Sequence, residues 1–147
     1  MTVTGGISAH QATAVAIAGR ALLIEGPSGS GKSSLALALI DRGAVLIGDD
    51  GVMLELADDR LLAHPHPETR GLLEVRGLGL LSYPVCETAP VALVLQLDGE
   101  APRYVEKSEI IKREGISLPL LRLWPDSPVL ALKAELALER FGLLLSN

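Results

Sequence analysis

The sequence of 147 residues contains one cysteine, 3% aromatic residues and no long hydrophobic run. Because Cys86 has no second cysteine to pair with, an intramolecular disulfide is excluded and a reducing cytoplasm is the expected compartment. Charged residues such as Arg20 and Asp41 interrupt the apolar stretches before they reach the roughly 18 residues of a membrane span. The segment Met1 to His10 lacks the basic and then apolar pattern of a secretory signal. We therefore expect no membrane partner.

Basic residues are also scarce, since 13 Lys and Arg stand against 18 Asp and Glu, for a net charge of −5. Proteins that bind nucleic acid or anionic membranes use clusters of basic side chains to neutralise phosphates, and no such block is present. The hydrophobic fraction of 48% excludes a disordered chain. The length predicts one domain over residues 1–147. Any site for phosphate must be local.

The order of apolar and glycine-rich segments predicts an α/β fold. Residues 14–18 and 21–25 are expected to form a strand hairpin that leads into a glycine-rich loop and a helix over 35–42. Further strands are expected at 44–48, 52–56, 61–63, 72–81, 91–97 and 117–123. A last helix is expected to start with Ser127 as cap and Pro128, burying a face of Val129, Leu132, Leu136 and Phe141.

A phosphate-binding loop is indicated by Gly26, four residues, then Gly31, Lys32 and Ser33. Glycines allow the backbone amides to converge on an anion, and the following helix adds the positive end of its dipole. Lys32 would reach the β and γ phosphates, while the Ser33 hydroxyl would bind Mg²⁺. A flexible Gly/Ser turn is the alternative, but the flanking strand and helix favour the phosphate loop. The predicted nucleotide-binding residues are Gly26, Pro27, Ser28, Gly29, Ser30, Gly31, Lys32, Ser33 and Ser34.

Carboxylates follow two of the expected strands. Asp98 precedes Gly99, so a turn role is favoured there. Asp49 and Asp50 follow 44–48, and the carboxyl end of a parallel strand is where ligands bind in open α/β sheets. If the extended path continues, only one of the two faces the phosphate, and the other holds a metal or the loop.

Glu74 and Arg76 are two residues apart in the expected strand 72–81, so both should point to one face. A carboxylate for a metal and a guanidinium for phosphate oxygens is one interpretation of this spacing. A structural ion pair at a sheet edge is the other. The spacing alone does not favour either.

Together, 26–34, 48–50 and the run Leu-Glu-Val-Arg-Gly-Leu-Gly-Leu-Leu at 73–81 resemble the catalytic domain of HPr kinase/phosphorylase. The resemblance is to the short bacterial form, which lacks the N-terminal domain. It implies a P-loop-containing, phosphoenolpyruvate-carboxykinase-like kinase domain with a β-hairpin-rich sheet and flanking helices. It also implies an enzyme that uses ATP and Mg²⁺ to phosphorylate a serine of the phosphocarrier HPr, commonly as a homo-oligomer and in the family as a hexamer.

Site roles follow from the resemblance, position by position. At the family's spacing from Lys32, the catalytic aspartate is Asp50, which would accept the proton of the serine hydroxyl. Ser33 and Glu74 match the magnesium positions of the family. Arg76 falls in the segment that the family needs for both reactions.

The sequence departs from the family pattern at three points. The family's catalytic histidine aligns with Gln11, and His10, one position away, is taken as its replacement. The late basic loop needed for dephosphorylation is replaced by 119–123, so kinase activity is better supported than phosphorolysis. The later catalytic arginine has three candidates, which are Arg103, Lys107 and Arg113.

The sequence thus predicts a cytoplasmic, Mg-ATP-dependent serine kinase that acts on HPr. Two alternatives remain open. One is a regulatory ATP-binding P-loop protein without phosphotransfer. The displaced histidine and the altered late loop support this alternative. The other is a small-molecule kinase on the same scaffold, which differs only in the acceptor.

Overall fold

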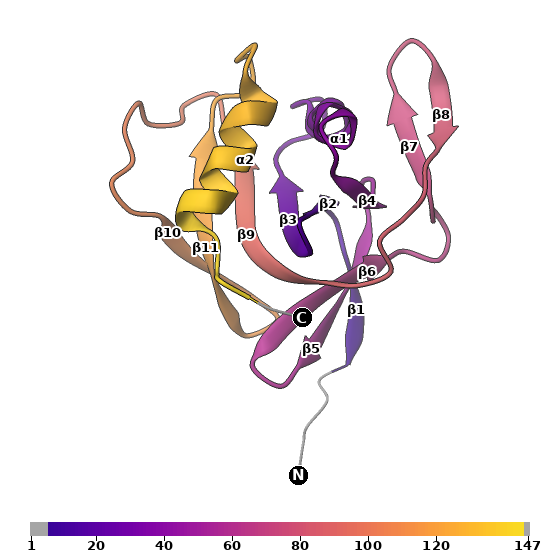
Figure 1. Cartoon of the computed structure of the whole chain (residues 1–147), viewed down its shortest axis with the longest axis horizontal. Coiled ribbons are helices and arrows are strands. Elements are labelled where there is room, and N and C mark those ends of the chain that lie inside the picture. The colour runs from indigo at the N-terminus through magenta and orange to yellow at the C-terminus, as the bar shows by residue number, and fades with distance from the viewer. Residues whose placement is uncertain (1–5, 146–147) are drawn as a thin grey trace.

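A mixed sheet of nine strands forms the body of the molecule, and two helices, α1 (Lys32–Asp41) and α2 (Leu130–Phe141), pack against it (Figure 1). This computed structural model describes residues 6–145. The strands of the sheet are β1 (Ile7–His10), β2 (Thr13–Ile17), β3 (Arg20–Glu25), β4 (Val45–Gly48), β5 (Val52–Ala57), β6 (Arg60–Pro65), β9 (Ala89–Leu97), β10 (Glu109–Arg113) and β11 (Ile116–Leu123). The arrangement confirms the expected α/β class with a hairpin-rich sheet.

The long strand β9 is the centre of this sheet. It pairs in parallel with β3 along one edge and with β11 along the other, and its first residues pair antiparallel with β6. Eight of its nine residues are buried, as is typical of a strand covered on both faces. The carboxyl ends of β3, β9 and β11 therefore meet at one edge, beside the start of α1 (Figure 1).

The expected hairpin of β2 and β3 is present, and Ala18 and Gly19 turn with positive φ of 50° and 84°. β4 continues the sheet on the far side of β2 and pairs with it antiparallel. A parallel strand was expected here, but β4 is antiparallel to β2, the strand with which it pairs. Because β2 lies between them, β4 nevertheless runs in the same direction as β3. Its carboxyl end thus lies at the same edge as the glycine loop.

The expected single strand over 72–81 is a hairpin, β7 (Leu72–Val75) and β8 (Gly79–Ser82), which forms a separate two-stranded sheet. The turn is closed by the Leu78 amide, which donates to the carbonyl of Val75 at 2.9 Å. Positive φ at Gly77 and Gly79, 90° and 106°, allows the reversal. The apolar run concealed this turn because leucines continue through it.

Side chains alternate along the central strands between two cores. Leu22 and Ile24 of β3 pack with the helices, and Ala21 and Leu23 pack into the second core, which β5 and β6 cover. This alternation follows from the two-residue period of a strand. The sheet is thus enclosed on both faces, which leaves its carboxyl edge as the position for a site.

The second helix begins later and buries a different face than expected. The Ser127 hydroxyl accepts the amide of Val129, but the helix itself begins at Leu130. The residues that α2 buries fully are Ala134, Ala137 and Leu138, whereas Val129, Leu132 and Leu136 are exposed. Small residues face the sheet because they allow close packing. Neither helix, nor any other within residues 6–145, has the length and apolar character required to cross a bilayer.

Candidate active site

The glycine loop connects β3 to α1 in a tight turn. The amide of Ser30 donates to the carbonyl of Pro27 at 3.1 Å, and the amide of Leu35 to that of Gly31 at 2.9 Å. Gly29 and Gly31 have φ of 78° and 103°, which residues with a Cβ rarely adopt. The loop therefore needs glycine at these positions in order to direct its amides outward at the N-terminus of α1.

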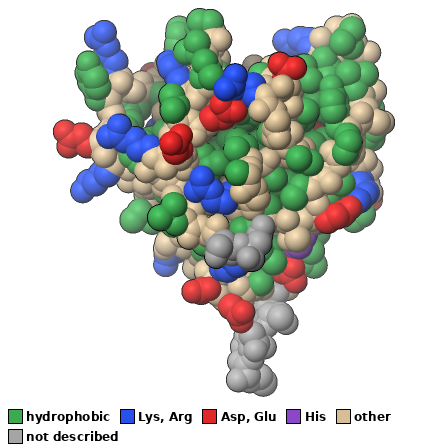
Figure 2. Space-filling view, viewed as in Figure 1, with side chains coloured by type: hydrophobic (Ala, Val, Ile, Leu, Met, Phe, Trp, Pro, Cys, Tyr) green, Lys and Arg blue, Asp and Glu red, His purple; other side chains and the backbone are tan. Residues whose placement is uncertain are grey.

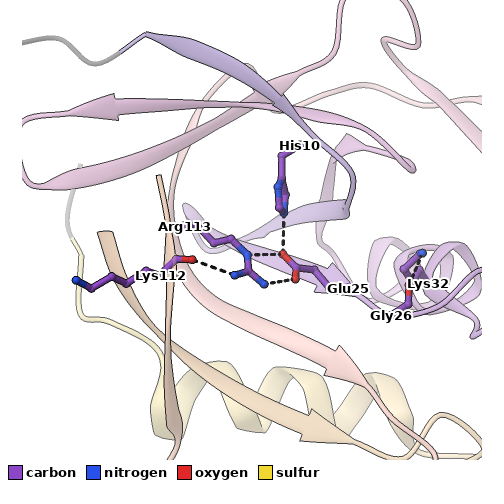
Figure 3. A network of polar contacts seen from close by, with 6 residues as sticks. All are labelled: His10, Glu25, Gly26, Lys32, Lys112 and Arg113. Carbon is purple, nitrogen blue, oxygen red and sulfur yellow. Dashed lines mark hydrogen bonds and ion pairs between the residues drawn. The ribbon is translucent and has the colours of Figure 1, made fainter. Parts of the chain in front are cut away.

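The Lys32 ammonium folds back over the loop and donates to the carbonyl of Gly26 at 2.8 Å (Figure 3). Gly26 itself is confined, since a Cβ there would lie 2.8 Å from the Ser30 Oγ and 3.2 Å from Leu97. Gly26, at the start of the loop, is thus held by the lysine through its carbonyl and by close packing against Leu97 of β9.

Asp49 joins four parts of the chain at this edge. Its Oδ1 accepts the Ser33 hydroxyl at 2.6 Å and the Thr13 hydroxyl at 3.0 Å. Its Oδ2 accepts the backbone amide of Glu74 at 2.9 Å. Because Thr13 is fully buried, its hydroxyl needs such a partner. The carboxylate of Asp49 therefore sets the position of the Ser33 hydroxyl at the start of α1.

Asp50 follows β4 in a left-handed conformation, with φ of 57°. Its amide donates to the Thr13 hydroxyl at 3.1 Å, which holds this turn. Such a backbone costs about 1 to 3 kcal/mol for a residue with a Cβ, and residues of this kind cluster at active sites as well as in turns. The extended path ends at Gly48, so the alternation that would turn one aspartate away does not apply.

These groups surround one open, mostly polar cleft of about 290 Å³. Nine of the residues predicted from the sequence line it, together with Asp49: Ser28, Gly29, Gly31, Lys32, Ser33, Ser34, Asp50, Glu74 and Arg76. Its lining does not include His10, Gly26, Pro27 or Ser30. Both tandem aspartates contribute, contrary to the expectation for an extended path.

Glu74 and Arg76 reach the cleft by a different route than expected. Glu74 lies in β7, and Arg76 is the first residue of the turn that follows. The premise of one extended strand was wrong, but both side chains line the cleft. Neither has an ion-pair partner among those found in residues 6–145. The structure therefore does not support the interpretation of a structural ion pair between them.

His10 and Arg113 meet at a second group, Glu25, the last residue of β3 (Figure 3). The His10 Nε2 lies 2.8 Å from Glu25 Oε2. Arg113 donates from Nη2 to Oε1 at 2.6 Å and from Nε to Oε2 at 3.2 Å. Of the three candidates for the later arginine, Arg113 thus reaches the end of β3, whereas Arg103 and Lys107 lie in the exposed 98–108 loop.

Two opposing effects act on the pKa of Glu25. Burial raises it, but the hydrogen bonds from His10 and Arg113 and their positive charge favour the ionised form more strongly. The result is a pKa lowered from 4.5 to about 2. The same contact raises the pKa of Arg113 above its usual value, because the hydrogen bond to Glu25 outweighs the effect of burial. Glu25 is thus an anion throughout the physiological range.

The donor groups suit a magnesium ion that is held mainly by phosphate. Within residues 6–145, no three His, Cys, Asp or Glu side chains gather as a metal cage. Mg²⁺ usually keeps several waters and takes one or two carboxylates plus substrate phosphates. Ser33 and Glu74, which line the cleft beside Asp49, fit that requirement.

Sequence reasoning left the roles of Asp49, Thr13 and Glu25 unassigned. Asp49 was one of two adjacent aspartates, and spacing alone did not show which would contact Ser33. Thr13 gave no signal, since a threonine is common in strands. Glu25 stood directly before the loop, but its partner Arg113 is 88 residues away.

The comparisons with known proteins agree with this geometry. A family model described as the HPr Serine kinase C-terminal domain matches residues 5–86. The HPr kinase/phosphorylase of Cupriavidus necator is 39% identical over 119 residues, which are 73% of this chain and 37% of that protein. That of Caldicellulosiruptor bescii is 34% identical over 122 residues, 74% of this chain and 39% of the relative. The chain thus spans less than two fifths of the length of these relatives.

A solved structure has the same fold. The Hpr(Ser) kinase/phosphatase from Coxiella burnetii superposes with a TM-score of 0.80 and covers 90% of this chain and 94% of its own, at 24% sequence identity. The match covers a larger share of the chain than the family model, which ends at residue 86. With the family model covering more than half of its length, the chain belongs to the family of HPr serine kinase C-terminal domains.

Proposed function

We propose that this chain is an ATP- and Mg²⁺-dependent kinase that phosphorylates a serine of the phosphocarrier HPr. One observation carries the proposal: the glycine loop, the Ser33 hydroxyl and the Asp50 carboxylate line the same cleft. Curated relatives carry the name HPr kinase/phosphorylase. We further propose one catalytic domain over residues 1–147, of the phosphoenolpyruvate-carboxykinase-like P-loop type, working as a cytoplasmic homo-oligomer.

The glycine loop is the proposed phosphate site. Its amides and the N-terminus of α1 provide donors and a positive potential for the β and γ phosphates of ATP. The Lys32 ammonium lies against the Gly26 carbonyl, and we propose that it turns from there to a bound phosphate. The loop therefore binds the nucleotide by backbone geometry, and Lys32 adds the positive charge.

Ser33 and Glu74 are the proposed protein ligands of Mg²⁺. The ion supplies charge that neutralises the phosphate oxygens. Asp49 acts on it through Ser33, because its carboxylate accepts a hydrogen bond from the hydroxyl and leaves the lone pairs of the hydroxyl oxygen free for the ion. Asp49 is thus a positioning residue.

Asp50 is the proposed general base. It would accept the proton of the serine hydroxyl as that oxygen forms a bond to the γ phosphorus, while the bond to the β-γ bridging oxygen breaks and ADP leaves. Arg76, which lines the same cleft, is proposed to stabilise the charge on the transferred group. His10 and Arg113, which meet at the end of β3, are proposed to lie on the side of the site where the acceptor binds. Arg113 is preferred as the later arginine.

Intact-mass spectrometry of HPr incubated with this protein, ATP and Mg²⁺ tests the proposal. We expect one phosphate adduct on HPr and none on a variant in which the acceptor serine is alanine. Lys32→Ala should abolish the adduct, and Asp50→Asn should abolish it while ATP binding persists. Added inorganic phosphate then tests for the reverse reaction.

The two alternatives give different results. ATP binding without any adduct would favour the regulatory nucleotide-binding protein. ATP turnover that requires a small molecule and leaves HPr unmodified would favour a small-molecule kinase. Equal loss of ATP binding and transfer in Asp50→Asn would make Asp50 a metal or folding residue instead of a base.

A further inference from the structure

The β7–β8 hairpin exposes two large apolar side chains beside the cleft. Leu78, in the turn, is 74% exposed, and Leu80, in β8, is 66% exposed. The hairpin projects from the body next to α1 (Figure 1), and hydrophobic side chains gather over its position in the same view (Figure 2). A single exposed leucine is ordinary, but apolar side chains that gather into a patch on a protruding element indicate an interaction site.

The hairpin is firmly attached through its other face. Leu73 is fully buried in the core that contains α1, and Val75 packs against the same core. In addition, the amide of Glu74 donates to Asp49 at 2.9 Å. The exposure of Leu78 and Leu80 is therefore not a sign of a loosely packed hairpin.

That exposed face is continuous with the cleft. Glu74 and Leu80 are directly opposite each other in the antiparallel register, so their side chains lie on the same face. Glu74 lines the cleft, whereas neither leucine does. A molecule that reaches the carboxylate of Glu74 from this side thus also contacts Leu80.

The shape of this surface favours a protein over a nucleobase. Bases and other small ligands bind in concave pockets that enclose most of their surface. Leu78, in a projecting turn, is mostly exposed and lies outside the cleft lining, so no pocket of this chain encloses it within the described residues. Protein partners bury such residues in the apolar centre of an interface.

We propose that Leu78 and Leu80 form the docking contact for the protein acceptor, whose own apolar side chains would cover them. The inference rests on the proposed kinase function and adds how the acceptor is recognised. Docking on the hairpin holds the serine at the adjacent cleft, where Asp50 and the γ phosphate of ATP act on it. The contact gives affinity for the acceptor and takes no part in the chemical step.

The test uses Leu78→Ser and Leu80→Ser in the full chain. We expect each to raise the KM for HPr about tenfold, since burial of a leucine in an interface contributes about a factor of ten to the affinity. The kcat and the KM for ATP should stay unchanged. Leu144→Ser, which alters a leucine that is 92% exposed near the C-terminus, is the matched control and should leave all three values unchanged.

Each contrary result has its own meaning. If the wild-type chain phosphorylates HPr and both leucine variants keep its KM, the docking inference is wrong while the kinase function stands. A raised KM for ATP in the variants would assign the leucines to the nucleotide instead. Light scattering that shows a smaller assembly for the variants would assign them to contact with a second copy. If the wild type leaves HPr unmodified, the proposed function fails, and the inference with it.

Discussion

At the scale of single residues, Asp49 stands out because all its observed partners are donors. Its two oxygens accept hydroxyls from Ser33 and Thr13 and the amide of Glu74. Asp49→Asn would replace one acceptor by an NH₂ group that faces a donor. We expect a loss of about 1 to 3 kcal/mol in the free energy of unfolding, the cost of leaving such a group unsatisfied. Urea denaturation measures it.

A matched control is Asp126→Asn, at an exposed position before α2, where the stability should stay the same within experimental error. The Asp49 variant should also need more Mg²⁺ for half-maximal activity, because the Ser33 hydroxyl is no longer oriented. Unchanged stability together with an unchanged Mg²⁺ requirement would show that the Asp49 contacts do not hold the site.

At the scale of elements, the end of β4 depends on the absence of a side chain at Gly48. A Cβ there would lie 2.4 Å from the carbonyl oxygen of Gly51 and 2.8 Å from Val52 Cγ1. Gly48→Ala must therefore displace the turn that carries Asp49 and Asp50. We expect a destabilisation of about 1 to 3 kcal/mol, as for overpacking, and a loss of transfer activity. Thermal unfolding and the HPr assay measure the two effects.

The control for this change is Gly99→Ala, at a glycine that directly follows Asp98 after the end of β9. No atom lies within 4 Å of a Cβ at Gly99, so both readouts should match the wild type. If Gly48→Ala were as stable and active as Gly99→Ala, the turn after β4 would not be the rigid support described above.

Elements were predictable from sequence where local signals agreed. The loop spacing, the strand before it and the helix after it all indicated one structure, and that structure is present. The β7–β8 hairpin was missed because leucines continue through its turn, so the apolar run concealed the glycines. The prediction of the buried face of α2 was wrong because the helix has two apolar sides, and only packing against the sheet selects the alanine-rich one.

At the scale of the whole molecule, Glu25 joins parts of the chain that are distant in sequence. Its carboxylate holds His10 on β1 and Arg113 on β10, while its own strand leads into the loop. The pKa of Glu25 lies at about 2 in the folded protein, below its usual 4.5. The ionised carboxylate therefore stabilises the fold above pH 4.5, and this contribution falls as the pH drops from 4.5 towards 2.

We expect Glu25→Gln to lower the free energy of unfolding on the order of 2 kcal/mol at neutral pH, after allowance for solvent screening. The difference from wild type should narrow below about pH 4.5, as the wild-type carboxylate takes up a proton. Urea denaturation at several pH values measures it. Glu87→Gln is the control, since that carboxylate pairs with Arg70 on the surface and should matter little. A difference that stays constant with pH would contradict the assignment.

Long-range contacts of this kind mark the limit of sequence reasoning for the site. Six of the nine loop residues predicted from the motif line the cleft together with Asp50, Glu74 and Arg76, whereas Gly26, Pro27 and Ser30 do not. The contact between Glu25 and Arg113 spans 88 residues and depends on which strands are neighbours, which no local pattern records. No local pattern predicted the contacts of the Thr13 hydroxyl with the Asp49 carboxylate and the Asp50 amide either.

The place of β9 at the centre of the sheet also affects how the chain folds. The strand that carries the loop, β3, pairs Ala21 with Val91, and the intervening β4 to β8 must be left out of that pairing. Contacts so distant in sequence close slowly, because chain entropy is lost before the contacts form. During synthesis, one edge of β3 stays unpaired until β9 leaves the ribosome. The phosphate loop thus follows a strand that completes its pairing only after more than half of the chain has been made.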